Sequence, residues 1–366
     1  MITNITLKNF KCFKSETSLP ISRVTLLYGK NGRGKSSVAQ SLLTLSQTIE
    51  NDSTLRVLQT NGNLVNLGGV RDVLNSYSNS TELSLQLNTD MSNCNEVLLK
   101  YCVKEQSNQF ELINLLVDGV DRFVDFGLAD EQETTRILGP ISDVHIFEDL
   151  KKVSYISAER MTPFEGENIA VASRIQPSGK NILGIFLSMP KEFQEEVRCA
   201  LSFVLSGANI EFKEVENRVE LRLNSIDGTT SYRPSNVGFG YSYVLPVIVS
   251  ALLAPQNGLL IIENPEAHLH TAAQSRIMEF LIEQVRRKDL QLLIETHSDH
   301  VVNGLRIAVR KQHIAPEDCK VLYFDYQNTQ QSITIVNSIR LDSKGNLSSY
   351  PDDFMDEWTK QMMELL

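Results

Sequence analysis

The chain has 366 residues, of which 42% are hydrophobic and 22% are charged, and its formal net charge is −10. This composition is ordinary for a globular protein of one or two lobes, and no apolar run approaches the roughly 20 residues that span a bilayer. The start of the chain lacks the layout of a secretory signal, and five scattered cysteines without a CxxC pair favour reduced thiols. We therefore expect a cytoplasmic protein without a membrane partner. Its acidic charge excludes a uniformly basic surface but not a local basic groove.

The beginning of the chain predicts the order strand, glycine-rich loop, helix. Two alternating runs at 2–10 and 23–29 are typical of strands, and the Ser- and Pro-containing segment 14–22 is expected to separate them. The second run ends in glycine and leads into a glycine-rich loop. After Ser37, apolar residues recur at helical spacing.

The rest of the chain predicts an α/β fold. Residues 61–127 alternate and carry turn residues, 170–207 contain helical patterns, and hairpins are expected after residue 209 with a turn at Asp227–Gly228. Beyond residue 236, helical patterns alternate with buried strands that begin near residues 258, 290 and 320. This alternation favours a parallel sheet core covered by helices, beside an antiparallel β subdomain and a helical lobe.

Residues 29–36 match the phosphate-binding pattern G-x-x-x-x-G-K-[ST] without adjustment. In this motif, backbone N–H groups and the following helix N-terminus surround phosphate oxygens, the lysine reaches the β and γ phosphates, and the Ser hydroxyl binds Mg²⁺. A strand and a helix are predicted on either side, as the mechanism requires. The predicted ATP-binding residues are Gly29, Lys30, Asn31, Gly32, Arg33, Gly34, Lys35, Ser36 and Ser37.

Two further signals follow buried strands. Glu263 comes directly after four apolar residues, where a carboxylate would hold Mg²⁺ or its water. His297 follows the next strand, where an imidazole would contact a γ-phosphate or the attacking water. The alternatives are a strand ending in a polar turn and an ordinary loop histidine. A histidine metal site is a weaker alternative, formed from His268, His270, His297 and His300.

A Ser- and Gly-rich loop at 235–242 precedes another predicted helix, so it offers a second anion cradle. Two cradles far apart in the sequence are consistent with one acting on a partner's nucleotide. The alternative is a tight loop that enters a buried helix. The candidate residues are Ser235, Asn236, Gly238 and Gly240.

These motifs together resemble the ABC-type ATPase heads of the SMC, RecF and OLD group. The segments that carry the resemblance are "ITLKNFKCFKSETSLPISRVTLLYGKNGRGKSS", "NVGFGYSYVLPV", "IIENPEAHLHTAAQ" and "ETHSDHVVN". The chain is particularly similar to predicted ATPases that carry ENPEAHLHP, ETHSDH and a C-terminal DUF3696-type segment, which "YPDDFMDEWTKQMMELL" resembles. Thr271 departs from the proline that usually ends the second block.

The resemblance implies one two-lobed ATPase domain that sandwiches ATP and Mg²⁺ in a homodimer. Ser36 and Glu263 would bind the metal, His297 would be the switch histidine, and the 235–242 loop would cap the other subunit's γ-phosphate. Gln59 is a weakly supported candidate for the Q-loop glutamine. The expected parts are a P-loop half at 1–60, an antiparallel subdomain at 61–160, a helical and hairpin insert at 161–234, a signature, Walker B and switch half at 235–325, and a DUF3696-like tail at 326–366.

Asn264 occupies the position where most relatives carry a catalytic glutamate. An Asn side chain can orient a water but cannot take its proton. General-base assistance is worth roughly 10²- to 10⁴-fold, so we expect slow hydrolysis unless Glu266 substitutes as the base. Asn264 also agrees with the similar subset, which has Asn at this position.

The sequence leaves several functions open. The main hypothesis is an ATP-gated dimer that controls a DNA-related or effector partner, such as a separate nuclease, in bacterial anti-phage defence. One alternative is a nucleotide-locked scaffold that silences an effector, which an exposed apolar tail would favour. A second is a DNA-end binder of the RecF or SMC kind, and a P-loop kinase or GTPase is weaker. We expect no nuclease in this chain. The possible apolar stripe of the tail is Phe354, Met355, Trp358, Met362, Met363 and Leu366.

Overall fold

The structure is a computed structural model that describes residues 1–92, 94–104, 107–126, 135–160, 167–168, 174–215, 218–224, 230–236, 240–327 and 333–365. It contains two compact units, and each is assembled from three separate segments of the chain. The first unit comprises 1–22, 30–153 and 324–338, and the second comprises 23–29, 154–323 and 339–366.

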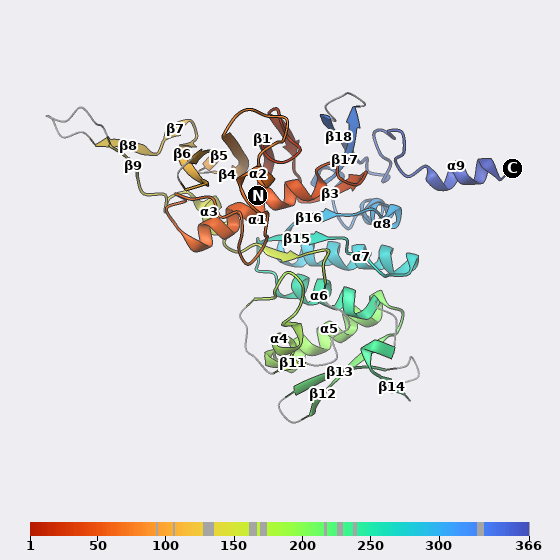
Figure 1. The fold of residues 1–366 in the computed structure, drawn as a ribbon. Helices are drawn as coiled ribbons and strands as arrows, with labels where there is room; N and C mark the ends of the chain where they lie inside the picture. Colours follow the sequence, from red (N-terminus) through yellow and green to blue (C-terminus); the bar gives the residue numbers. More distant parts are fainter. Residues whose placement is uncertain are drawn as a thin grey trace. The chain divides into compact units, whose positions relative to one another are not determined.

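An antiparallel sheet forms most of the first unit (Figure 1). Its strands, in spatial order, are β2 (Thr17–Pro20), β1 (Ile2–Lys8), β4 (Glu82–Met91), β5 (Cys94–Lys104), β6 (Gln109–Val117) and β7 (Val120–Asp121). Buried and partly buried residues alternate along β4, as expected for a sheet with one face covered more than the other. The expectation that 14–22 only separates two strands is wrong, because β2 pairs there with β1. Only four residues long and ending in Pro20, β2 gives a weak pattern.

The remaining elements of the first unit are three helices and a hairpin: α1 (Lys35–Asn51), α2 (Val70–Val73), α3 (His145–Leu150), β8 (Phe123–Phe126) and β9 (Thr135–Leu138). Helix α1 is buried along most of its length, and Val38, Leu42 and Leu45 are among its buried residues. The Ser46 hydroxyl donates to the Leu150 carbonyl at 2.6 Å, which joins α1 to α3.

A mostly parallel sheet forms the centre of the second unit. Its spatial order is β10 (Ser154–Ile156), β15 (Leu259–Glu263), β16 (Gln291–Glu295), β3 (Val24–Gly29), β17 (Cys319–Gln327) and β18 (Ile333–Arg340), and the boundary between the units falls within the last two strands. The pairs β10/β15, β15/β16 and β16/β3 are parallel. Every residue of β15 and β16 is buried, which explains their continuous apolar sequences.

The helices of the second unit are α4 (Ile182–Ser188), α5 (Lys191–Val204), α6 (Gly240–Leu253), α7 (Thr271–Lys288), α8 (Asp299–Arg310) and α9 (Glu357–Glu364), with short 3-10 turns at Pro234–Asn236 and Pro316–Asp318. Figure 1 shows α7 and α8 alongside the parallel strands. Apolar residues of α5 to α8 and of the strands form one core. This arrangement confirms the predicted α/β class.

A small antiparallel sheet completes the second unit: β11 (Glu167–Asn168), β13 (Arg218–Asn224), β12 (Asn209–Val215) and β14 (Ser231–Tyr232). It contains the expected hairpins, and the predicted turn at Asp227–Gly228 lies outside the described residues. Within the described part of the chain, no helix is both long and apolar enough to span a bilayer.

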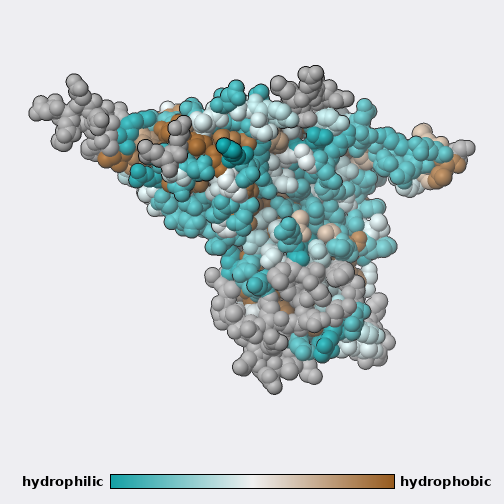
Figure 2. All heavy atoms as spheres, viewed as in Figure 1, coloured by the Kyte–Doolittle hydropathy of each residue, from teal (hydrophilic) through white to brown (hydrophobic). Residues whose placement is uncertain are grey.

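The predicted apolar stripe of the tail is divided by the structure. Phe354 is only 1% exposed and packs edge-on against the rings of Tyr28 and Tyr323. Helix α9 buries none of its own residues, and Trp358 and Met363 are 71% and 72% exposed. Figure 2 shows apolar surface at the end of this helix. The tail is therefore fixed to the second unit at Phe354, whereas the apolar residues of α9 face solvent.

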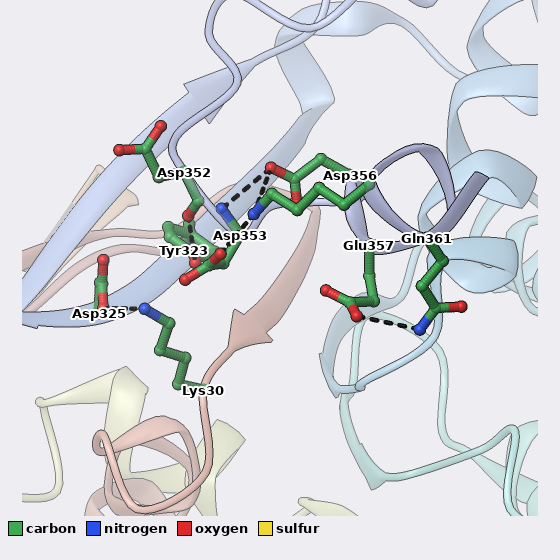
Figure 3. Close-up of polar contacts among 9 residues, drawn as sticks. Lys30, Tyr323, Asp325, Asp352, Asp353, Asp356, Glu357 and Gln361 are labelled. Atoms are coloured by element: carbon green, nitrogen blue, oxygen red, sulfur yellow. Dashed lines mark hydrogen bonds and ion pairs between the residues drawn. The ribbon is translucent and has the colours of Figure 1, made fainter. Parts of the chain in front are cut away.

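Polar contacts hold residues 352–356, which precede α9 (Figure 3). The Lys360 ammonium lies 2.6 Å from Asp353 and 3.0 Å from Asp356. The Tyr323 hydroxyl donates to the Asp352 carbonyl at 2.9 Å. The side chains of the two ion pairs are 35% to 50% exposed, so the ion pairs add little to the free energy of unfolding.

Candidate functional site

Three neighbouring parallel strands end at the same edge of the second unit's sheet. Glu263, the last residue of β15, pairs in register with Glu295, the last residue of β16. β3 lies on the other side of β16 and ends at Gly29, the first residue of the phosphate-binding motif. The backbone N–H of Asn264 donates to the Glu295 carbonyl at 2.8 Å, which extends the ladder beyond the strand ends. The fold thus brings the start of the motif beside the two predicted catalytic turns.

Glu263 is held in one orientation. Its Oε2 accepts a hydrogen bond from the Ala158 backbone N–H at 3.0 Å, and the side chain is buried. Burial, and then the neighbouring Glu263 carboxylate, raise the pKa of Tyr155 above its ordinary value, as expected for a hydroxyl that donates to this carboxylate. An oriented carboxylate at a strand end is a ligand that Mg²⁺ prefers, so Glu263 fits the expected metal-binding role.

Asn264 has a left-handed backbone, with φ of 45°. Asn adopts this region more readily than most residues, which gives the amide a conformational reason to be here. Its Oδ1 is buried and has no hydrogen-bond partner among the described residues. An unsatisfied buried acceptor costs about 1–3 kcal/mol and is characteristic of a site that contacts a ligand or water.

Glu266 connects the two turns that are predicted to be catalytic. Its Oε1 accepts from the His297 backbone N–H at 2.8 Å. Burial raises the pKa of Glu266, and the His297 N–H and the Thr296 hydroxyl partly oppose that rise. Its other oxygen is buried and, within the described ranges, lacks a hydrogen-bond partner. One carboxylate oxygen is therefore occupied in positioning the segment that carries His297.

The predicted switch residue His297 has an exposed side chain between β16 and α8. The next residue, Ser298, caps α8: its hydroxyl accepts from the Val301 N–H at 3.2 Å and donates to Gln274 at 2.6 Å. The cap fixes the backbone just after the imidazole and leaves the ring at the edge where the strands end.

The alternative histidine metal site is not supported. His268 lies against Tyr243, with ring centroids 4.3 Å apart, and His270 caps α7 by accepting from the Ala272 N–H at 3.4 Å. Across the described ranges, no group of three His, Cys, Asp or Glu side chains could hold a metal ion. These contacts give both histidines roles in local structure.

The phosphate-binding loop enters the first unit after Gly29. Gly34, which precedes α1, has φ of 100°, and a Cβ there would lie 2.4 Å from the Cys12 sulfur. Only glycine therefore fits this position without rearrangement. The first turn of α1 contains no acidic side chain, so its amides can bind an anion. Ser36 and the buried Ser37 lie in this turn, and Asn31 is exposed.

The cationic side chains of the loop are fixed by neighbours in the same unit. The Lys35 ammonium is 3% exposed and donates to the Lys30 carbonyl at 2.7 Å. Lys30 forms an ion pair with Asp325 at 3.1 Å (Figure 3). The Arg33 guanidinium lies 3.8 Å from the centre of the Tyr326 ring. The end of β17 therefore orients two of the loop's cations.

A cavity of about 520 Å³ adjoins the loop, and its lining includes Lys11, Cys12, Phe13, Gly32 and Arg33. Its size suits the base or sugar of a nucleotide. Lys11, Cys12 and Phe13 are not among the site residues predicted from the sequence. The available signal was their position just after the first strand, in the segment that resembles the N-F-K-x-F of ABC-type heads.

The signature loop is only partly described. Ser235 and Asn236 belong to a 3-10 turn, Gly238 lies outside the described residues, and Gly240 begins α6. A Cβ at Gly240 would lie 3.0 Å from the His268 carbonyl oxygen, so the start of α6 lies close to the turn after β15. Gln59, the candidate Q-loop residue, bonds through its backbone to α1, with its N–H 2.9 Å from the Thr48 hydroxyl. The assigned roles stay predictions.

Sequence reasoning also missed Arg160, which is 5% exposed and contacts the carbonyls of Glu263 and Asn264. The only signal was an arginine a few residues after a short buried strand. These two partners are backbone atoms 103 and 104 residues away, so no pattern of side chains in the sequence predicts the contacts.

Solved structures share the fold. An SMC head bound to the C-terminal winged-helix domain of ScpA is 14% identical, with a TM-score of 0.56 over 93% of this chain and 98% of that one. The SMC head domain from Thermotoga maritima is 11% identical, with a TM-score of 0.51 over 92% and 98%. A Pyrococcus furiosus SMC head with an extended coiled coil, bound to the C-terminal domain of ScpA, is 12% identical, with a TM-score of 0.53 over 100% and 99%. These matches confirm the ABC-type head fold.

Family models cover most of the sequence, although no curated protein matches it. Residues 314–365 match the protein of unknown function DUF3696, which confirms the resemblance of the C-terminal segment to that family. Residues 24–303 match the family described as "AAA domain, putative AbiEii toxin, Type IV TA system". Because this match covers more than half of the chain, the protein belongs to that AAA-domain family of ATPases.

Proposed function

We propose that this ATPase-family protein binds ATP and Mg²⁺, hydrolyses ATP slowly, and dimerises around the nucleotide to gate a separate partner. One observation carries the proposal. Three adjacent parallel strands end at one edge with Gly29, Glu263–Asn264 and the turn that contains His297. In open α/β sheets, ligands bind outside the carboxyl ends of the strands.

Each residue has a role that its chemistry allows. By the ABC-type resemblance, the amides at the start of α1 and Lys35 would bind phosphate oxygens, and Ser36 and Glu263 would be the Mg²⁺ ligands; the metal would supply neutralisation of negative charge during phosphoryl transfer. The buried amide oxygen of Asn264 accepts a hydrogen bond from the attacking water but takes no proton. Glu266 fixes the backbone of His297 through one oxygen. The attacking water is therefore oriented, but no strong base takes its proton. ATP hydrolysis is expected to be slow for this reason.

The dimer and the partner are the more distant part of the proposal. The loop around Ser235 and Gly240 would contact the nucleotide of a second copy, as the likeness to ABC-type heads suggests. The family description names a putative toxin of a type IV toxin–antitoxin system, which agrees with a role in bacterial anti-phage defence. The gated partner would then be an effector such as a nuclease, or DNA.

A nucleotide-locked scaffold is the second candidate, and the exposed helix α9 favours it. Trp358, Met362 and Met363 are all exposed large apolar residues on this short helix, and such residues are enriched at protein interfaces. In a scaffold, bound ATP would stabilise the dimer and hydrolysis would rarely occur.

Single-turnover and steady-state ATP hydrolysis by the purified chain tests the proposal. Lys35→Ala is expected to weaken ATP binding about 10- to 100-fold, since hydrogen bonds to charged groups contribute roughly 1.5–3 kcal/mol. Lys311→Ala removes only an exposed ion pair with Glu279 and serves as the matched control. Tight ATP binding by Lys35→Ala would remove the P-loop assignment. A stable ATP dimer without steady-state turnover would favour the scaffold.

A further inference from the structure

Arg160 is a buried guanidinium whose described hydrogen bonds all go to backbone carbonyls. It follows β10, and its side chain is only 5% exposed. Nε donates to the Ser157 carbonyl at 3.1 Å, and Nη1 donates to the Tyr243 carbonyl at 3.2 Å. Burial lowers the pKa of Arg160 to about 10, and the nearby carboxylates, Glu266 first, oppose that shift, so the group stays charged at neutral pH.

The third nitrogen of Arg160 contacts the catalytic turn. Nη2 donates to the carbonyl of Glu263 and, at 3.2 Å, to that of Asn264. Asn264 is the residue with the left-handed backbone. The same short segment also orients the Glu263 carboxylate through the Ala158 N–H. One polar cluster thus fixes both the backbone and the carboxylate at the end of β15.

The Tyr243 carbonyl gives this cluster a second anchor. Tyr243 lies in the first turn of α6, which begins at Gly240, directly after the signature loop. The Tyr243 ring also lies 5.8 Å from the guanidinium. Because the guanidinium is planar and its donors have a fixed geometry, a displacement of the first turn of α6 cannot leave the contacts at the catalytic turn unchanged.

We propose that Arg160 is a positioning residue that couples the start of α6 to the Glu263–Asn264 turn, so that engagement of the signature loop aligns the residues for hydrolysis. The inference deepens the proposed function and rests on it. Arg160 contacts no reacting atom in this scheme. It acts through the turn, where a misplacement of about 1 Å can cost 10²-fold in rate.

The test compares Arg160→Lys and Arg160→Met with the wild type. Arg160→Met is expected to lower kcat about 10²-fold while the Kd for ATP changes by less than about threefold, because the phosphate-binding loop is untouched. Arg160→Lys retains the charge but lacks the planar set of N–H donors, so an intermediate loss of kcat is expected. Arg276→Met is the matched control: Arg276 also donates to a carbonyl in this unit, that of Val204 at 2.9 Å, and its kcat is expected to stay within about threefold.

Thermal unfolding separates positioning from folding. A loss of kcat in Arg160→Lys at an unchanged Tm supports the coupling between α6 and the Glu263–Asn264 turn. If Arg160→Met fails to fold, the result for Arg160→Lys alone tests this coupling. Unchanged kcat in Arg160→Lys and Arg160→Met would overturn the inference. So would a loss that Arg276→Met reproduces, or a parallel loss of kcat and ATP affinity.

Hydrogen exchange gives a readout that does not require turnover. With a non-hydrolysable ATP analogue and Mg²⁺, amides near the start of α6 and those of Asn264, Glu266 and Ala267 are expected to gain protection together in the wild type. In Arg160→Lys, only the α6 amides should respond. Equal responses in both proteins would overturn the coupling. If the wild type binds nucleotide but never hydrolyses it, the ATPase proposal fails, and this readout still decides the role of Arg160.

Discussion

The edge of the parallel sheet and the C-terminal helix both depart from the ordinary burial of residue types, but in opposite directions. At the edge, the charged side chains of Arg160 and Glu263 are buried among backbone groups. In α9, Trp358 and Met363 are largely exposed. Buried charges and exposed large apolar residues are the two departures from ordinary burial that carry information. In the proposed function, the first region acts within the chain and the second acts toward a partner.

The difference follows from the backbone in each region. Beyond β15 the chain turns sharply at Asn264, which leaves carbonyls that a guanidinium can satisfy. Helix α9 is eight residues long and has no buried residue, so among the described residues nothing covers its apolar side chains. Four substitutions test this contrast.

Phe354→Ala is expected to have the largest effect on stability. The ring is buried against Tyr28 and Tyr323, with centroids 5.1 and 5.3 Å away, and truncation of a buried Phe typically costs about 3–5 kcal/mol. Denaturant unfolding measures the change, with Phe354→Leu as the milder control. A cost below about 1 kcal/mol would mean that the whole tail, and not only α9, is loosely attached.

Glu263→Gln is expected to lower kcat by roughly 10²- to 10³-fold, or about 3–4 kcal/mol of barrier. The amide can still accept from the Ala158 N–H, so the fold and the Kd for ATP should change little. Mg²⁺ titration of steady-state hydrolysis measures the effect. Equal losses of turnover and of nucleotide affinity would contradict the assigned metal role.

Asn264→Asp should increase kcat about 10-fold. Asp tolerates the left-handed backbone and adds a carboxylate, while its short side chain keeps the gain at or below the lower end of the 10²–10⁴ expected of a general base. A Glu at this φ is less suitable, because a left-handed backbone costs most residues about 1–2 kcal/mol. Single-turnover rates of ATP hydrolysis measure the effect. A lower rate in Asn264→Asp would mean that the lack of a carboxylate at this position does not limit hydrolysis.

Trp358→Ser is expected to change the free energy of unfolding by less than about 0.5 kcal/mol, as for other exposed positions. Denaturant unfolding measures this change next to Phe354→Ala. A destabilisation above about 1 kcal/mol would show that Trp358 packs against this chain in solution. The contrast between the two regions would then disappear.

The sequence predicted the elements that have strong periodicity or required glycines. Gly29 to Ser37 was predicted because a glycine loop between a strand and a helix has few alternatives, and β15 because four apolar residues precede Glu263. Strand β2 was missed because four residues that end in proline give little signal.

The contacts of the site were less predictable. Arg160 donates to backbone carbonyls, which every residue has. The residue types of its partners therefore give no signal in the sequence. Helical spacing grouped Phe354 with Trp358, yet it does not reveal which of them another element covers. The role of Glu266 in holding the His297 backbone depends on a turn geometry that only the folded chain defines.

The turn after β15 also has a consequence for chemical ageing. Asparagine side chains deamidate when the backbone nitrogen of the next residue attacks the amide and forms a cyclic imide. The residue after Asn264 is Pro265, whose backbone nitrogen carries no hydrogen. That route to aspartate is therefore closed at this position. If Asn264 slows ATP hydrolysis, its amide is protected from this route of conversion into a carboxylate that would act as a base. The rate of ATP hydrolysis should therefore not increase during long storage of the protein.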